Sequence, residues 1–202
     1  MPSTYTLKHY ERAEAASYSA SERFTHALVM LTRTVWHADC TFETAIGAIC
    51  EAAASAMQVE RVSVWEYEPR AKLLRCLQAH SPSRGGGTLS EDLDTLTLEG
   101  DDYIAALQYV RALDVSDVEL GAADPSGLIQ LQEYLHKHRI HSRLDAPACV
   151  DGEMLGVICL ESVDRARGWT QEEVTFAASM GDYVAMAYQI SRRREAEEEV
   201  RT

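Results

Sequence analysis

The residues whose side chains are best suited to binding or catalysis lie in one stretch of the chain, residues 139–164. In its first half every second side chain is ionisable: His141, Arg143 and Asp145. Because side chains of a β-strand alternate between its two faces, we expect these three on one face. An arginine guanidinium offers a planar fork of donors that fits a carboxylate or a phosphate. The pattern therefore predicts either a ligand-binding surface or an ion-pair network that satisfies itself.

The elements that must position these side chains have the pattern of an antiparallel hairpin. Two apolar-rich runs, residues 144–150 and 154–163, flank the dipeptide Asp151-Gly152. An Asp-Gly pair between two such runs is typical of a tight hairpin turn. Each strand would present a packing face on one side and an ionisable face on the other.

Two registers of this hairpin are possible. A two-residue loop places Leu144 opposite Cys159. A three-residue loop instead places Arg143 opposite Cys159, and it also places His141 opposite Glu161. A slip of one residue moves every side chain to the other face. We favour the three-residue loop because it gathers the apolar side chains on one face and the ionisable ones on the other.

Aromatic residues from elsewhere in the chain are expected to surround the ionisable face. Trp65 lies in a predicted strand, Tyr103 and Tyr109 lie in one predicted helix, and Tyr134 lies in another. Aromatic side chains at such positions fill a core more often than they line a pocket, and both interpretations stay open. The predicted ligand-binding residues are Trp65, Tyr103, Tyr109, His141, Arg143, Asp145, Cys159 and Glu161.

Three other patterns carry weaker predictions. His136, His138 and His141 are potential metal ligands, but a predicted helix end between them turns the rings apart, so we expect no metal site. Cys159 paired with His141 would form a reactive thiolate. The glycine-rich residues 81–87 lack the Lys-Ser/Thr of a phosphate-binding loop and are interpreted as a linker.

Composition argues against several classes of protein. The 202 residues include 19 basic and 32 acidic side chains, a formal charge of −13, which argues against a nucleic-acid-binding surface. No apolar run approaches the roughly 20 residues that span a bilayer, and the first residues lack the pattern of a signal peptide, so we expect a cytoplasmic protein without a membrane partner. The five cysteines form no CxxC pair and are expected to be reduced and buried.

Periodicity predicts a protein of mixed helices and strands. The last helix carries two apolar stripes, one through Gly181 and Val184 and one through Met180 and Tyr183. A helix that is apolar on two sides packs against two partners, here a sheet and either a helix bundle or a second subunit. We expect helices at 21–35, 42–57, 101–110, 125–138 and 171–200, strands at 61–68, 73–79 and in the central hairpin, and an exposed connection at 91–99.

The order of these elements resembles that of the GAF domain family. Three segments carry the resemblance: VERVSVWEYEP at 59–69, LDAPACVDGEMLGVICLES at 144–162 and WTQEEVTFAASMGDYVAMAY at 169–188. The family implies an α+β fold, a PAS-like twisted antiparallel sheet with terminal helices on one face and an insert-covered pocket on the other. It also divides the chain into an N-terminal helical arm (1–40), the GAF domain (41–190) and the start of a C-terminal signalling helix (191–202).

The resemblance implies a non-catalytic sensory module that binds a small, unidentified ligand. The signal would pass through the terminal helices of a homodimer to an output domain, either the histidine kinase of a two-component system or a cyclic-di-GMP enzyme. The Cys-His pair of bilin-attaching relatives is replaced here by Gln130-Leu131, and the Asn-Lys pair of cyclic-nucleotide binders is missing, so no particular cofactor is implied. Two alternatives stay open: a dimerisation module without a ligand, and a thiol enzyme similar to free methionine sulfoxide reductases.

Overall fold

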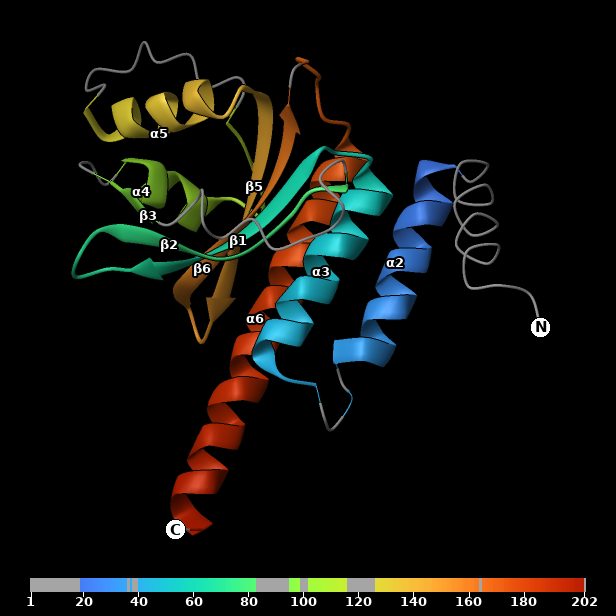
Figure 1. The fold of residues 1–202 in the computed structure, drawn as a ribbon, viewed down its shortest axis with the longest axis vertical. Helices are drawn as coiled ribbons and strands as arrows, with labels where there is room; N and C mark the ends of the chain where they lie inside the picture. Colours follow the sequence, from blue (N-terminus) through green and yellow to red (C-terminus); the bar gives the residue numbers. More distant parts are fainter. Residues whose placement is uncertain are drawn as a thin grey trace.

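A six-stranded antiparallel sheet forms the centre of the protein, with its strands in the order β3-β2-β1-β6-β5-β4 (Figure 1). The computed structural model describes residues 19–35, 37, 40–82, 95–98, 102–115, 126–163 and 165–201. The α+β fold class is confirmed. The strands are β1 (Arg61–Glu68), β2 (Leu73–His80), β3 (Thr95–Thr97), β4 (Leu113–Asp114), β5 (Ile140–Val150) and β6 (Glu153–Val163). The helices are α2 (Ala20–Val35), α3 (Phe42–Met57), α4 (Asp102–Tyr109), α5 (Ser126–Lys137) and α6 (Gln171–Arg201).

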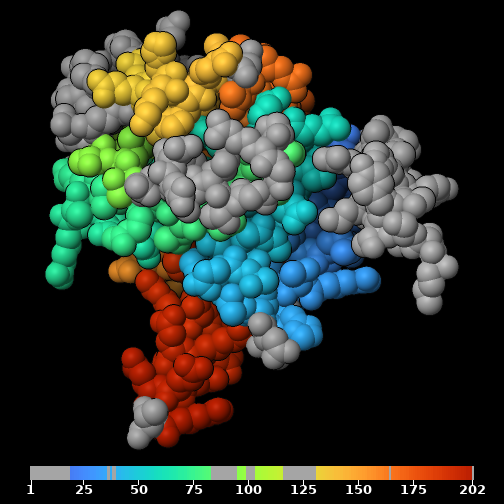
Figure 2. All heavy atoms as spheres, viewed as in Figure 1, coloured from blue at the N-terminus to red at the C-terminus, as the bar shows by residue number. Residues whose placement is uncertain are grey.

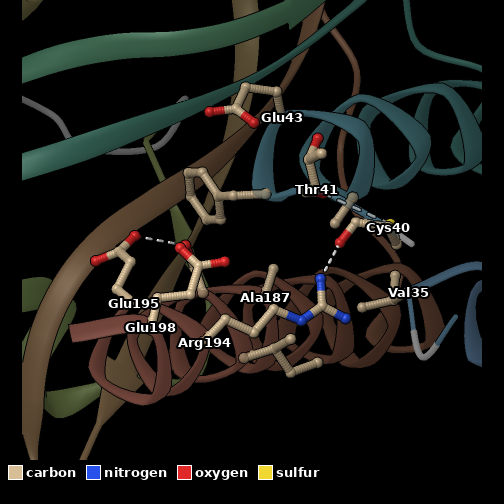
Figure 3. A pocket seen from close by; sticks show the side chains of 12 residues that line it. Val35, Cys40, Thr41, Glu43, Ala187, Arg194, Glu195 and Glu198 are labelled. Atoms are coloured by element: carbon tan, nitrogen blue, oxygen red, sulfur yellow. Dashed lines mark hydrogen bonds between the residues drawn. The ribbon is translucent and has the colours of Figure 1, made fainter. Parts of the chain in front are cut away.

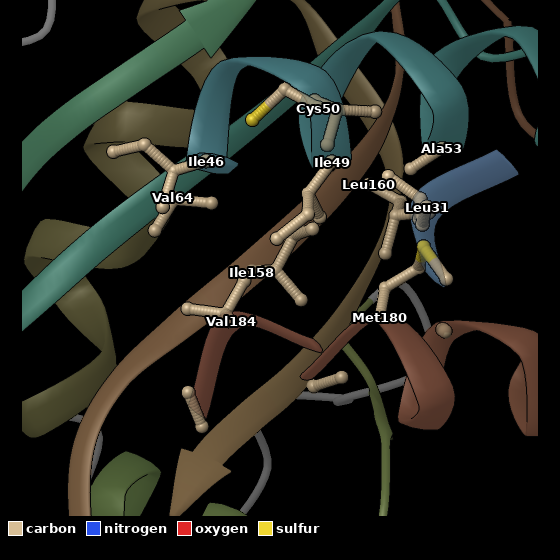
Figure 4. Packing of buried hydrophobic residues seen from close by; sticks show 14 of the residues in the cluster. Leu31, Ile46, Ile49, Cys50, Ala53, Val64, Ile158, Leu160, Met180 and Val184 are labelled. Atoms are coloured by element: carbon tan, nitrogen blue, oxygen red, sulfur yellow. The ribbon is translucent and has the colours of Figure 1, made fainter. Parts of the chain in front are cut away.

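Helices α3 and α6 cover one face of the sheet, and α2 packs on these two helices (Figure 1). Helix α3 begins where the sequence predicts, because the Thr41 hydroxyl accepts a hydrogen bond from the Thr44 amide at 3.2 Å. Its apolar stripe is buried on the sheet, where Ile46 lies near Val64 and Ile158 (Figure 4). Each fully buried aliphatic side chain of this layer contributes about 1.5–3 kcal/mol of transfer free energy. The layer holds the strands from the side opposite the ionisable face.

Helix α6 begins with a capping box. The Thr170 amide donates to the Glu173 carboxylate at 2.8 Å, and the Glu173 amide donates to the Thr170 hydroxyl at 3.3 Å. The helix runs for 31 residues, and its last turns extend beyond the body of the protein (Figures 1 and 2). In the described part of the chain, neither α6 nor any other helix combines the length and the apolarity needed to cross a bilayer.

Both apolar stripes of α6 are covered within the chain. On one side, Gly181 lies against β5, where an added Cβ would come within 2.6 Å of the Pro147 carbonyl oxygen. On the other side, Phe176 stacks on Phe24 of α2 with ring centroids 4.5 Å apart. The Tyr183 hydroxyl also donates to the Leu28 carbonyl at 3.1 Å. The partners of α6 are therefore the sheet and a helix bundle, the first of the two arrangements that the stripes predicted.

Helices α4 and α5 cover the opposite face of the sheet (Figure 1). A second apolar cluster fills this side, with Tyr103, Leu107 and Leu131 from the helices over Trp65 and Val157 from the strands. The two apolar clusters lie on opposite faces because successive side chains of β1, β5 and β6 alternate between them. The insert is thus a packed layer over the face that carries the ionisable residues.

The predicted exposed connection at 91–99 instead contains the edge strand β3. This strand pairs with β2 and is accompanied by two buried leucines, Leu96 and Leu98. Residues 91–94 and 99 lie outside the described residues. A strand of three residues is too short for period-two alternation to reveal it, and pairing with β2 decides its conformation.

The preferred hairpin register is wrong, although its separation of the two faces is correct. Asp151 and Gly152 form a two-residue loop in which both have positive φ, 52° and 85°. A bulge between Ala148 and Cys149 then shifts the pairing by one residue. As a result, Arg143 pairs with Glu161 and Asp145 pairs with Cys159. The two-residue loop alone would have placed the ionisable residues of β5 opposite apolar residues of β6. The bulge brings the ionisable residues of both strands back to one face.

Candidate functional site

Four charged side chains meet beneath the insert, on three adjacent strands. Arg61 on β1 lies opposite Glu161 on β6, which in turn lies opposite Arg143 on β5, so the sheet register brings them into one row. Asp145 is two residues further along β5 and shares their face. Arg143, Asp145 and Glu161 are at most 1% exposed, and Arg61 is 9% exposed. Two positive and two negative charges are therefore enclosed together.

The four charges form two linked ion pairs. Arg143 Nε donates to both carboxylate oxygens of Asp145, at 2.7 and 2.9 Å. Arg61 Nε donates to Glu161 Oε2, and the other oxygen of Glu161 lies 3.6 Å from Arg143 Nη1. Burial lowers the pKa of Arg143, but the neighbouring acidic groups, with Asp145 the largest of them, together outweigh this and hold the pKa well above its ordinary value. Both arginines therefore stay charged inside the protein.

Tyrosine hydroxyls from the insert close this network. The Tyr103 hydroxyl on α4 donates to Asp145 Oδ2 at 2.5 Å and accepts from Arg143 Nη2 at 3.4 Å. The Tyr134 hydroxyl on α5 accepts from Arg61 Nη2 at 3.4 Å. The guanidinium carbons of Arg143 and Arg61 lie 5.5 and 5.8 Å from the centroid of the Tyr134 ring, within the range of cation–π attraction. Both insert helices thus contact the buried charges through a tyrosine.

Cys159 lies inside the network as a neutral thiol. It is fully buried, and Arg143 Nη2 donates to its sulfur at 3.0 Å. Burial raises the pKa of the Cys159 thiol well above its ordinary value, and the positive charge of Arg143 only partly offsets this. His141 does not face it. A thiol of this kind accepts a hydrogen bond but is a poor nucleophile.

Six of the eight predicted ligand-binding residues lie together in this region. Besides the residues just described, Trp65 is buried, and its ring packs edge-on against Tyr134 at 5.6 Å. The Trp65 indole N–H donates to the Ser63 hydroxyl at 2.8 Å, so its polar atom is satisfied. Whether these residues bind a ligand stays a prediction. The six are Trp65, Tyr103, Arg143, Asp145, Cys159 and Glu161.

The expected positions of His141 and Tyr109 are wrong. His141 is the extra residue of a bulge between Ile140 and Ser142, so it is exposed while Ile140 takes the place on the inner face. Tyr109 ends α4 and is 90% exposed. Six residues after Tyr103, it points about 240° around the helix, away from the sheet. Neither side chain lines the site.

Two residues of the network were absent from the predicted set, namely Arg61 and Tyr134. Arg61 lies two and four residues before Ser63 and Trp65, so alternation along β1 places all three side chains on one face. The sequence could therefore have predicted its position. Tyr134 was one of the aromatic residues expected near the ionisable face, but the packing of α5 on the sheet decides that its side chain is buried there. Among the described residues, no group of three or more His, Cys, Asp or Glu side chains is arranged to hold a metal ion.

Solved structures share the fold of this chain. The GAF domain from a phosphoenolpyruvate-protein phosphotransferase of Coxiella burnetii is similar with a TM-score of 0.65 and 16% identity, over 88% of this chain and 99% of that one. A far-red absorbing protein with bound biliverdin is similar with a TM-score of 0.66 and 13% identity, over 84% and 99%. A bacteriophytochrome from the photosynthetic bacterium R. palustris gives 0.65 and 13%, over 89% and 39%. The TM-scores show a shared fold, and at identities this low the likeness extends to the fold alone.

Sequence comparison assigns the family. None of the curated proteins compared with the chain matches it. The profile of the GAF domain family, in contrast, matches residues 41–188, which include the central hairpin and the first half of α6. This match covers most of the chain and includes all three segments that suggested the resemblance. The chain therefore belongs to the GAF domain family.

Proposed function

We propose that this GAF domain is a sensory module whose ligand binds between the sheet and the insert of residues 81–137. The observation that carries the proposal is the closure of the buried charge network by Tyr103 and Tyr134, one from each insert helix. A ligand that competes for these charges must change the contacts of α4 and α5. The position of the insert would then depend on what the network binds.

Strand β5 provides the route from this site to the terminal helices. The face of β5 beneath the insert carries Arg143 and Asp145. The opposite face packs on α6, with the Pro147 carbonyl close to Gly181. A shift of β5 would therefore move the surface on which α6 packs. A ligand alters the balance of two arrangements only if it binds one more tightly than the other. We propose that the output domain, a histidine kinase or a cyclic-di-GMP enzyme, is controlled through α6.

The chemistry of the network favours a ligand with a carboxylate or a phosphate. Arg143 and Arg61 each present a planar fork, and the ligand would replace Asp145 or Glu161 as their partner. Biliverdin is bound by one of the similar structures and carries carboxylates, so it belongs among the compounds to test. Non-covalent binding is the form to expect, since the chain has Gln130-Leu131 where bilin-attaching relatives have Cys-His.

A thermal-shift screen of small carboxylates, phosphates and biliverdin tests this proposal. At a concentration one hundred times its dissociation constant, a ligand stabilises the folded state by about 2.7 kcal/mol, or roughly 5–10 °C for a domain of this size. The shift is expected to be lost in Arg143→Lys, measured against the unliganded variant, because lysine keeps the charge but not the fork. A panel without any stabilising compound, or a shift that Arg143→Lys retains, contradicts the proposal.

The second candidate function is a dimerisation module without a ligand. The charge network favours this function, because its two arginines and two carboxylates already neutralise one another without a ligand. Apolar side chains on the terminal helices offer a surface: Val29 and Met30 on α2 are about half exposed, and Val200 on α6 is 87% exposed.

We expect the protein to be a homodimer through these helices under either function. Light scattering at micromolar concentration should give twice the mass of one chain. Val29→Glu combined with Met30→Glu should give the mass of a single chain, because two buried carboxylates without partners oppose association. A wild-type protein that scatters as a monomer contradicts dimerisation and leaves the ligand proposal standing. The third candidate, a thiol enzyme, is opposed by the raised pKa and full burial of Cys159.

A further inference from the structure

A groove of about 340 Å³ lies on the helical side of the protein, between the start of α3 and the second half of α6 (Figure 3). It is on the opposite side of the sheet from the charge network. Its volume is at the lower end of the range for small-molecule sites. The groove therefore has room for a compact organic molecule, and it is separate from the site proposed above.

The floor of this groove is apolar and partly aromatic. Val35, Ala45 and Ala187 are almost fully buried in it, and Phe42 and Ile190 are half-buried. The Phe42 ring is held in place by Tyr188, with centroids 4.7 Å apart. A fixed aromatic ring offers its face to an apolar body or, by cation–π attraction, to an ammonium group.

The rim of the groove is acidic. Glu43 lies on one side, and Glu195 and Glu198 lie on the other (Figure 3). The two glutamates of α6 are three residues apart, a spacing at which like charges on a helix repel. A cation between the rims would be attracted by the carboxylates on both sides.

Among the described residues that line the groove there is one arginine, Arg194, and its guanidinium binds backbone carbonyls. The Arg194 guanidinium donates to the Cys40 carbonyl and, at 3.3 Å, to the His37 carbonyl. It thereby fastens α6 to the connection between α2 and α3 (Figure 3). Because its N–H groups donate to these carbonyls, the Arg194 side chain lines the groove without being an anion-binding group. The lining residues leave an acidic rim over an apolar floor.

We propose that this groove binds a small organic cation with an apolar body, such as an aryl-ammonium or alkyl-ammonium compound. The apolar body rests on Phe42 and Ile190, and the ammonium group lies between Glu43 and Glu195. A bound cation contacts α3 and α6 together, close to where α6 leaves the body of the protein (Figure 1). It therefore holds the exit of α6 in one orientation, independently of any ligand beneath the insert.

Three compounds of the same shape test the proposal on the full chain: phenethylamine, 2-phenylethanol and phenylacetate. They differ in charge at the end of one aromatic body. Amide chemical shifts followed by NMR at low ionic strength should show saturable phenethylamine binding near Phe42, Ser191 and Arg194. The alcohol should bind about tenfold more weakly, corresponding to about 1.4 kcal/mol, and phenylacetate more weakly still.

Variants of the rim provide the matched comparison. Glu195→Gln should weaken phenethylamine binding by about threefold, and Glu43→Gln with Glu195→Gln by about tenfold. Ser191→Leu should abolish binding by filling the groove. Glu172→Gln removes an exposed carboxylate at the other end of α6 and should leave the affinity unchanged. Equal binding of the three compounds, or unchanged affinity in the double variant, overturns the proposal.

Discussion

Arg143→Ala is expected to lower the free energy of unfolding by about 3–5 kcal/mol. The guanidinium is 1% exposed and binds Asp145, Tyr103 and Cys159. Its removal leaves the Asp145 carboxylate buried with the Tyr103 hydroxyl but without a positive charge beside it. Most of the loss comes from this unpaired charge rather than from the missing contacts. Urea denaturation followed by circular dichroism measures the change.

Two further variants show whether the effect has this origin. Arg193→Ala removes a guanidinium that is 81% exposed and pairs with Glu197, and it should change the stability by less than about 0.5 kcal/mol. Arg143→Met combined with Asp145→Asn removes both charges and should be more stable than Arg143→Ala. If Arg143→Ala costs less than about 1 kcal/mol, the pair is not enclosed as described, and the coupling of the insert to the network is wrong.

Gly181→Ala is expected to destabilise the protein by forcing α6 away from the sheet. An added Cβ would lie 2.6 Å from the Pro147 carbonyl oxygen and 3.4 Å from the Ala146 Cβ, so α6 must move away from β5. Overpacking against backbone costs about 1–3 kcal/mol, even though alanine favours the helix by about 1 kcal/mol over glycine. The melting temperature should fall, and amide exchange in the middle of α6 should become faster.

Gly168→Ala is the matched control for this substitution. Gly168 lies three residues before α6, and an added Cβ there would meet no atom within 4 Å. Its stability should equal that of the wild type or exceed it slightly, because alanine reduces the entropy of the unfolded chain. A Gly181→Ala protein as stable as Gly168→Ala would show that α6 is not seated on β5 at the distance described. The proposed route from β5 to α6 would then fail.

The inner and outer faces of the hairpin could be predicted from the sequence, but its pairing could not. Alternation along β5 and β6 correctly separated Arg143, Asp145, Cys159 and Glu161 from the apolar residues. The register depends on two bulges, and each adds one residue without leaving a mark in the apolar pattern. The bulge at His141 moved that side chain to the surface, which period-two reasoning had placed inside.

The sequence by itself predicted the order of the main elements and the chemical character of each strand face, and its resemblance to the GAF domain family implied the fold. The order and the strand faces follow from local periodicity, caps and turn residues, which act over a few neighbouring positions. Only the tertiary structure decided that Arg61 joins Glu161 across 100 residues of chain, that Tyr103 and Tyr134 close the network, and that Tyr109 stays outside. Contacts of this kind depend on how the insert packs on the sheet, and the free energy of that packing is shared among residues that lie far apart in sequence.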